Sequence, residues 1–541
     1  MEKALANWNY ADLWESVADA VPSRPAQIHG DRALTWEHFD RRADALERHF
    51  LEAGLQRQSK VAAYLYNGPE YLETYFAAFK AGLAPVNANY RYVADELVYL
   101  LDNADAEAVV FHAAFVPTVE EIRSRLPKVK AWVAVGGGGE LPAFVADYES
   151  LACEATGRTV APWGRSGEDL LILYTGGTTG MPKGVMWRQE DLFFVLGAGG
   201  NLLLELPPFV TFDDAGTRAL ALDPGVLIAA APLMHGTAQF SAIMALTSGG
   251  TVACLPAQRF DAQAFWEEAA RLRATSAAIV GMAFAAPMLE VLDANPGRWD
   301  LSNLRRLGSS GTVWSMENKR GLLRHLPGCA IFDSLGSSEA VGMGASASAA
   351  GGEAQTAKFA VGPNSAVFTE DGRRVTPGSG ERGQVAVSGY LPVGYYKDPE
   401  KTARTFRELE GRRWSVPGDF ATVEADGTLT LLGRGSQVIN TGGEKVFPEE
   451  VEEAIKRFPG VRDAAVVGVP DARFGERICA VVDAGDLRPS LAEISEHVRG
   501  HLAAYKTPRE LVLAPIQRAP NGKLDYRSVR DQALAALGKS A

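Results

Sequence analysis

The stretch Tyr174 to Gly184 reads YTGGTTGMPKG and contains four glycines, three threonines and one cation, Lys183. It directly follows the apolar run Leu170 to Leu173, which the pattern predicts as a buried strand. A glycine-rich turn at the end of such a strand can direct backbone N–H groups into an anion-binding concavity. The hydroxyls and Lys183 add donors and positive charge, so this glycine-rich loop predicts a polyphosphate site. The alternative is a flexible surface hairpin.

The spacing of the loop matches neither the Walker pattern nor the Rossmann fingerprint of three glycines. Four later motifs accompany it: DSLGSSE at 333–339, PGD at 417–419, GRGSQVINTGGEKVFPEEVE from Gly433 and PNGKLDYR from Pro520. In this order, the five motifs resemble those of the adenylate-forming superfamily of acyl-CoA synthetases, firefly luciferase and peptide-synthetase adenylation domains. The resemblance covers nearly the whole chain. Within the superfamily, TGGTTG, MWR, SLGSSE and INTGGEKVFPEEVE are most similar to bacterial ligases that couple steroid side-chain or other polycyclic carboxylates to coenzyme A.

The fold predicted from the sequence is of the α/β class. Strand and helix patterns alternate from Lys60 to Phe111, which is typical of parallel sheets covered on both faces. A period of two from Val361 to Gly389 predicts a small antiparallel β subdomain, whereas Ala345 to Thr356 lacks bulky residues and predicts a mobile loop. The resemblance implies a large N-terminal ATP- and acyl-binding domain (1–433), built of doubly wound parallel sheets. It also implies a mobile α+β C-terminal domain (434–541), with a hinge at 434–437.

The composition describes an ordinary globular chain of 541 residues with a formal net charge of −12, which argues against nucleic-acid binding. The four scattered cysteines predict neither a disulfide framework nor a zinc site. No signal peptide and no apolar run of spanning length is apparent, so we expect a cytoplasmic location. The oligomeric state stays open, with a homodimer as one alternative.

The nucleotide site is predicted from the glycine-rich loop, from two strand ends and from the small β subdomain. Asp419 is our ribose ligand because a carboxylate can accept hydrogen bonds from vicinal hydroxyls. The resemblance implies that Gly311 and Thr312 form one side of the adenine slot, that Asp333 to Gly336 form the other, and that Arg434 contacts ribose or phosphate. The full set predicted to bind ATP and AMP is Thr175, Gly176, Gly177, Thr178, Thr179, Gly180, Lys183, Gly311, Thr312, Asp333, Ser334, Leu335, Gly336, Ser338, Asp419 and Arg434.

Four residues are predicted to be catalytic: Lys523, Thr178, Glu339 and His235. Glu339 is suited to hold Mg²⁺ beside phosphate oxygens, although an isolated glutamate in a loop is often only solvated. His235 follows a strand end, where ligands gather in α/β sheets. We interpret it as a pocket wall rather than a general base, the alternative being a histidine packed within the turn. Lys523 lies in a Pro/Gly turn, and only the resemblance implies that it swings in to bridge the substrate carboxylate and the α-phosphate.

Coenzyme A, the acceptor of the acyl group, and the acid substrate have separate predicted sites. Coenzyme A is assigned to Gly442, Gly443, Glu444 and Lys445, because glycines without Cβ atoms could line a narrow tunnel for pantetheine. The hinge residue is Gln437, where the family usually has Asp or Lys. Two further departures are Leu335 in place of a tyrosine and Pro417 in place of a threonine. The predicted acyl pocket comprises His235, Gly236, Gln239, Gly281, Met282, Gly308, Leu335 and Val341.

The chemistry expected from these residues is positioning and charge stabilisation without a nucleophilic side chain. Attack of a carboxylate on ATP would give acyl-AMP, and the thiolate of coenzyme A would then displace AMP. No acid occurs in Met234 to Met244, which disfavours an amino-acid substrate. The resemblance favours a polycyclic carboxylate, with a medium- or long-chain fatty acid next. An acyl-AMP ligase for a carrier protein, an enzyme of the thioester half-reaction alone and a non-catalytic nucleotide- or acyl-binding protein are the remaining alternatives.

Overall fold

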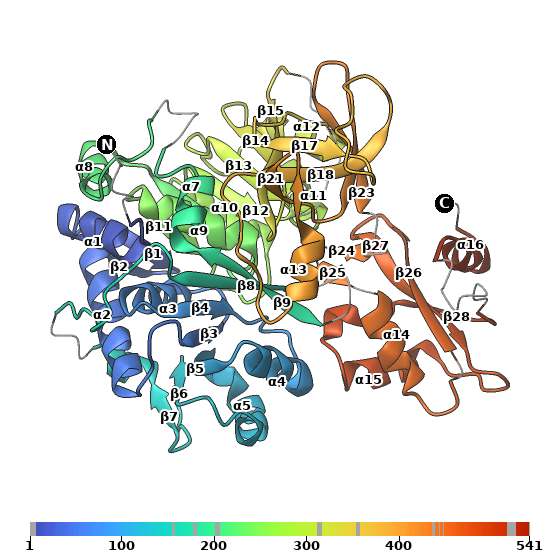
Figure 1. The fold of residues 1–541 in the computed structure, drawn as a ribbon, viewed down its shortest axis with the longest axis horizontal. Coiled ribbons are helices and arrows are strands. Elements are labelled where there is room, and N and C mark those ends of the chain that lie inside the picture. The colour runs from blue at the N-terminus through green and yellow to red at the C-terminus, as the bar shows by residue number, and fades with distance from the viewer. Residues whose placement is uncertain are drawn as a thin grey trace.

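Figure 1 shows a large part that holds most of the chain and a smaller part, coloured orange to red, that contains the C-terminal elements. The computed structural model describes residues 7–153, 157–176, 181–200, 206–310, 316–352, 358–434, 439–442, 444–446, 448–461, 463–516 and 526–539. In these ranges no helix combines the length and the apolar character that crossing a lipid bilayer requires.

The first large sheet has eight strands in the order β15-β14-β13-β12-β10-β11-β1-β2. Its inner strands are parallel, and β15 and β2 run antiparallel at the two edges. Their bounds, in that order, are Ala340–Ala349, Ala330–Ser337, Arg306–Ser310, Ser276–Ile279, Val226–Ala229, Thr251–Cys254, Pro25–His29 and Arg32–Thr35.

The second large sheet has the order β19-β9-β8-β4-β3-β5-β6-β7. Its strands from β8 to β7 are parallel, and β9 pairs antiparallel with both β8 and β19. Apolar side chains occupy both faces of its strands, as in β8, where Leu171 and Leu173 face one core and Ile172 faces another. The bounds are Gly394–Tyr395, Pro182–Arg188, Leu170–Gly176, Ala84–Asn87, Lys60–Tyr64, Ala106–His112, Ala131–Val135 and Val145–Asp147.

Helices cover both faces of the two sheets. The core between the sheets is filled from α1 (Tyr10–Ala20), α2 (Trp36–Glu52), α3 (Pro69–Lys80), α6 (Tyr148–Ala152), α7 (Gln189–Val195), α8 (Asp213–Ala221) and α9 (Gly236–Thr247). The outer faces are covered by α4 (Ala94–Asn103) and α5 (Val116–Ile122) on one sheet, and by α10 (Ala262–Arg271), α11 (Gly281–Ala294) and α12 (Met316–His325) on the other. The doubly wound arrangement predicted from the sequence is therefore confirmed.

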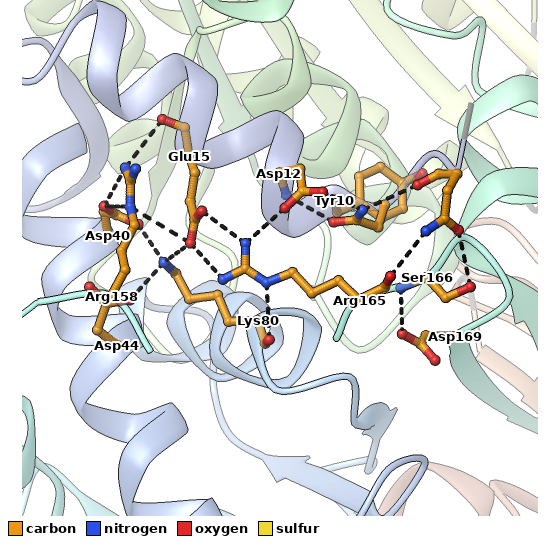
Figure 2. Close-up of polar contacts among 12 residues, drawn as sticks. Tyr10, Asp12, Glu15, Asp40, Asp44, Lys80, Arg158, Arg165, Ser166 and Asp169 are labelled. Atoms are coloured by element: carbon orange, nitrogen blue, oxygen red, sulfur yellow. Dashed lines mark hydrogen bonds and ion pairs between the residues drawn. The ribbon is translucent and has the colours of Figure 1, made fainter. Parts of the chain in front are cut away.

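A buried ionic cluster joins the first three helices (Figure 2). Lys80 on α3 is completely buried, and its Nζ lies 2.5 Å from Glu15 on α1 and 2.6 and 2.7 Å from Asp40 and Asp44 on α2. Arg165 also pairs with Glu15, at 2.8 Å. The three carboxylates lie close enough together to hold a metal ion, but the Lys80 ammonium already lies among them. The cluster is therefore a structural network that fixes the three helices to one another.

The small antiparallel β subdomain has the strand order β16-β23-β22-β18-β21-β20, with β17 paired to β18. The bounds are Lys358–Phe359, Leu429–Arg434, Asp419–Val423, Arg382–Ser388, Arg412–Ser415, Phe406–Leu409 and, for β17, Ser365–Phe368. The helix α13 (Pro399–Thr405) precedes β20. One prediction is wrong: residues 345–349, expected in a mobile loop, form the end of β15 and pair with β14. Backbone hydrogen bonds hold this strand, so it needs no bulky side chains.

The C-terminal part is a five-stranded sheet with three helices. The strands β25, β24, β27 and β26 are antiparallel, and β28 is parallel to β27. The bounds are β24 Ile439–Thr441, β25 Glu444–Val446, β26 Asp463–Asp471, β27 Gly475–Asp483, β28 Glu510–Leu513, α14 Pro448–Lys456, α15 Leu491–Arg499 and α16 Tyr526–Ala536. Strand β23 ends one sheet at Arg434, and β24 begins the next at Ile439. The boundary at 433–434 stays a prediction, and the hinge residue Gln437 lies outside the described residues.

Candidate active site

A cavity of about 700 Å³ lies where both large sheets, the small β subdomain and the C-terminal sheet meet. Its wall includes the end of β8, the start of α9, the strands β13 to β15, and a contribution from the C-terminal part. The predicted site residues that line it are Thr175, His235, Gly236, Gly308, Ser334, Leu335, Gly336, Ser338, Glu339, Val341 and Glu444. The structure thus brings together residues that are up to 269 positions apart along the chain.

The glycine-rich loop connects the antiparallel strands β8 and β9. Thr175 lies on the cavity wall and is the strand partner of Lys183. Gly176 is the last residue of β8, whereas Gly177, Thr178, Thr179 and Gly180 lie outside the described residues. The Lys183 ammonium forms an ion pair with Asp398, the N-cap residue of α13. The charge of Lys183 is therefore compensated within the protein, and the side chain does not line the cavity.

The adjacent strands β13 and β14 supply the predicted nucleotide side of the cavity. Ser310 at the end of β13 donates a hydrogen bond to the Ser334 carbonyl oxygen, at 3.0 Å. Asp333 forms an ion pair with Lys319 and is not part of the cavity wall. Gly311 and Thr312 lie outside the described residues. Of the residues predicted to form the adenine slot, Ser334, Leu335 and Gly336 of β14 border the cavity.

Glu339 is the carboxylate that could hold a metal ion here. It borders the cavity, and its Oε1 accepts a hydrogen bond from the Tyr395 hydroxyl at 2.7 Å. The neighbouring backbone is fixed from two sides, because Trp187 donates to the Ser338 carbonyl and Ser415 donates to the Glu339 carbonyl. Mg²⁺ is commonly held by one or two carboxylates together with substrate phosphates. Glu339 fits that requirement.

The predicted ribose ligands lie on neighbouring strands of the small β subdomain. Asp419 begins β22 and is buried, with 8% of its surface exposed. Arg434 ends β23 and is the direct strand partner of Asp419. The backbone therefore places both residues at the same end of these two neighbouring strands, although neither is part of the described cavity wall.

The C-terminal sheet closes the cavity through Glu444. This carboxylate forms an ion pair with Arg91 and lies 3.6 Å from Nε2 of His235, the N-cap residue of α9. Burial opposes ionisation of Glu444, but neighbouring basic groups outweigh it and lower its pKa to about 2. These groups are His235, Arg91 and Lys506. His235 thus contacts the C-terminal part, a role that the sequence did not indicate.

The remaining residues of the predicted coenzyme A motif form the β24–β25 hairpin. Gly442 has a φ of +60°, in the left-handed region, and an added Cβ would lie 2.8 Å from Phe474. A larger residue would be strained there for both reasons. Gly443 lies outside the described residues, as does the side chain of Lys445. Lys523 also lies outside the described residues.

Two residues predicted for the acyl pocket do not border the described cavity. Gln239 is completely buried, and its Nε2 donates to the hydroxyls of Tyr71 and Tyr75 and to the Leu233 carbonyl. It therefore stabilises the α9–α3 contact and does not border the cavity. Gly281 begins α11, and its N–H donates to Ser309 Oγ at 3.0 Å, also away from the wall. Met282 is on α11, but its side chain lies outside the described part.

The sequence analysis missed several cavity residues. Asn87 ends β4, and its side chain bonds Tyr174 N–H and the carbonyls of Tyr174 and Met234. A buried amide at the end of an apolar strand was a detectable signal. Arg306, Tyr505 and Lys506 also border the cavity, and no local pattern indicated them.

Comparison with known proteins gives a consistent result over the whole length. Residues 14–396 match the AMP-binding enzyme family, and residues 450–523 match the AMP-binding enzyme C-terminal domain. The chain is 41% identical over 533 residues to a medium/long-chain-fatty-acid–CoA/3-oxocholest-4-en-26-oate–CoA ligase of Mycobacterium tuberculosis, covering 97% of this chain and 96% of that protein. It is also 41% identical over 539 residues to a 3-oxocholest-4-en-26-oate–CoA ligase of Rhodococcus rhodochrous, with the same coverage.

Solved structures share the fold. The amide bond synthetase McbA from Marinactinospora thermotolerans matches with a TM-score of 0.76 and 23% identity, over 97% of this chain and 99% of that one. The o-succinylbenzoate CoA synthetase of Bacillus subtilis matches with a TM-score of 0.77 and 20% identity, over 96% and 98%.

Proposed function

The chain belongs to the AMP-binding enzyme family, and from this premise we propose that it is an AMP-forming acyl-CoA ligase for a bulky hydrophobic carboxylate of the sterol or terpenoid type. The observation that carries the proposal is the single cavity of about 700 Å³ that Thr175, Glu339 and Glu444 border together. The residues proposed to lie near the phosphates and the metal ion therefore border the same cavity as a residue of the C-terminal part.

The acid class is supported by two observations. Relatives at 41% identity are ligases of 3-oxocholest-4-en-26-oate, and the cavity has room for a polycyclic acid. The cavity wall where the acid would lie carries small residues, among them Gly236 and Gly308, which leave space for a wide ring system. A medium- or long-chain fatty acid is the second candidate, because the Mycobacterium tuberculosis relative is named for both substrates.

In the first half-reaction, a carboxylate oxygen attacks the α-phosphate of ATP and pyrophosphate leaves, giving acyl-AMP. Backbone N–H groups of the glycine-rich loop, with Thr178 and Thr179, hold the departing phosphates. Glu339 would hold Mg²⁺, which would supply positive charge beside the phosphate oxygens. Lys523 stabilises the negative charge that develops between carboxylate and phosphate. Asp419 and Arg434 hold the ribose.

In the second half-reaction, the thiolate of coenzyme A displaces AMP. The support for assigning the β24–β25 hairpin to this step is that Glu444 reaches the cavity wall and contacts Arg91 and His235. Gly442, next but one to Glu444 in the chain, would then stand beside the crevice. Rotation at 434–437 would exchange this hairpin for Lys523 between the two steps.

We also propose a cytoplasmic location. Its support is that Cys153, Cys254, Cys329 and Cys479 are all free thiols, as expected in a reducing compartment.

The test is to measure release of AMP and formation of thioester with ATP and Mg²⁺ across fatty, aryl, steroid and diterpenoid acids, with and without coenzyme A. The proposal expects AMP and acyl-CoA from steroid or terpenoid acids at the highest kcat/KM. AMP without thioester would favour transfer to a carrier protein. Thioester from supplied acyl-AMP, without AMP from any free acid, would mean a thioester-forming enzyme alone.

A further inference from the structure

Strand β13 forms a wall that runs from the predicted reaction centre into the depth of the cavity. Arg306, Gly308 and Ser310 occupy alternate positions, are partly exposed and border the cavity, whereas Leu307 is buried on the opposite face. Ser310 lies at the carboxyl end of β13, where its hydroxyl donates a hydrogen bond to the Ser334 carbonyl oxygen. Four residues of strand correspond to about 13 Å, so Arg306 lies at the far end of this wall.

Gly308 leaves the space between these two ends open. An added Cβ at Gly308 would meet only the Ala277 carbonyl oxygen within 4 Å, at 3.7 Å. The surface of β13 between Ser310 and Arg306 is therefore open at Gly308, which leaves room there for a long acid.

The charge of Arg306 has no partner among the described residues. Its guanidinium forms no hydrogen bond or ion pair with them, and burial alone lowers its pKa. The two described acidic residues on the cavity wall have other partners. Glu339 accepts a hydrogen bond from the Tyr395 hydroxyl, and Glu444 forms an ion pair with Arg91.

Lys506, the other described lysine or arginine on the cavity wall, has a counter-charge. Lys506 pairs with Glu96, with 2.7 Å between Nζ and Oε1. A partly buried charge without a counter-charge destabilises the folded protein. A ligand that places a hydrogen-bond acceptor beside Arg306 would offset that destabilisation.

We propose that Arg306 is a specificity-determining residue that donates hydrogen bonds to a carbonyl oxygen at the end of the acid remote from the reacting carboxylate. The inference rests on the proposed function and narrows it: the preferred substrates are long hydrophobic acids with a distal keto group. The name 3-oxocholest-4-en-26-oate describes such an acid, with a ring ketone and a side-chain carboxylate at opposite ends.

The experiment compares 3-oxocholest-4-en-26-oate with cholest-4-en-26-oate, which lacks the keto oxygen. Both kcat/KM and calorimetric binding of each acid are measured, so that recognition is read independently of turnover. The variants are Arg306→Met, which removes the donors, Arg306→Lys, which keeps a charge, and Arg305→Met. Arg305 is the exposed neighbour outside the cavity wall and serves as the matched control.

The unmodified protein is expected to prefer the keto acid by roughly 10- to 100-fold, the range for a hydrogen bond to a charged group. Arg306→Met abolishes most of this preference, Arg306→Lys keeps part of it, and Arg305→Met keeps all of it. Equal preference for both acids, or a preference that survives Arg306→Met, overturns the inference. Keto-selective binding without turnover of either acid would instead reject the ligase proposal while supporting the role of Arg306.

Discussion

At the scale of single residues, the proposed mechanism assigns Lys523 to the first half-reaction alone. We predict that Lys523→Ala slows acyl-AMP formation by about 10² to 10³, the usual effect of removing one donor from a developing charge. Thioester formation from supplied acyl-AMP is expected to persist, because the proposed mechanism gives the lysine no role in that step. Pyrophosphate exchange and thioester release measure the two steps separately.

The control for this variant is Lys539→Ala, in the same C-terminal region, where the ammonium lies 3.6 Å from Glu510. It should affect neither step. An equal loss of both steps in Lys523→Ala would contradict the assignment.

Glu47 predicts a pH dependence of stability. It is completely buried on α2, and no hydrogen bond reaches either carboxylate oxygen. Burial raises its pKa from 4.5 to about 8. Between pH 4.5 and about pH 8, Glu47 is therefore protonated in the folded protein and ionised in the unfolded chain. The free energy of unfolding falls by up to about 4 kcal/mol as pH rises through this interval.

Glu47→Gln removes the titrating group, so the variant should gain stability relative to the unmodified protein between pH 5 and pH 8. Urea unfolding at several pH values measures the difference. Glu52→Gln, an exposed change on the same helix, should show no such trend. A constant difference between Glu47→Gln and the unmodified protein would show that Glu47 does not titrate in this range.

At the scale of elements, the ionic cluster around Lys80 holds α1, α2 and α3 together. Lys80→Met keeps the length of the side chain but removes the cation that three carboxylates share. Asp44 is then left without an ion pair among the described residues, whereas Glu15 keeps Arg165 and Asp40 keeps Arg158. We expect the free energy of unfolding to drop by about 3–5 kcal/mol, as for other buried ion pairs that lose one partner. Urea unfolding of the N-terminal part measures it.

Arg41→Met is the comparison, because Arg41 on α2 pairs with Glu37 at 2.7 Å with 60% of its side chain exposed. Exposed pairs of this spacing contribute about 0.5 kcal/mol or less. Similar losses in both variants would mean that burial of the cluster adds nothing to its strength.

At the scale of the whole molecule, ion pairs between the two parts hold the C-terminal sheet over the cavity. Lys506 and Glu96 are 410 positions apart and both nearly completely buried. Glu96→Gln keeps the shape but leaves the Lys506 ammonium without its counter-charge. We predict a fall of about 10-fold or more in thioester formation from acyl-AMP, since a lost buried charge partner costs several kcal/mol, with acyl-AMP formation affected less.

Asp102→Asn controls for a charge change on the same helix, α4, because Asp102 is exposed and pairs only with Lys128 at 3.5 Å among the described ion pairs. It should leave both rates unchanged. If Glu96→Gln slowed only acyl-AMP formation, this closed arrangement would belong to the first half-reaction instead.

Most elements follow directly from local pattern. Thr35 caps α2 as its position before the amphipathic run predicts, and the strands β3, β5 and β8 contain apolar runs. The failures occur where partners come from elsewhere. Residues 345–349 resemble a loop in composition, yet β14 supplies the backbone partners that make them a strand. Gln239 is predicted as a pocket residue, but its side chain is buried and donates hydrogen bonds to Tyr71 and Tyr75 of α3.

The order of helices and strands, the place of the glycine-rich loop at a strand end and the family all follow from the amino-acid order, because these depend on apolar period, glycine positions and contiguous motifs. Only the folded chain decides which side chains border the cavity. Lys183 is held by Asp398, 215 positions away, while Arg306 stands at the far end of the wall without a partner among the described residues. Such outcomes depend on packing between distant segments, and no local pattern encodes them.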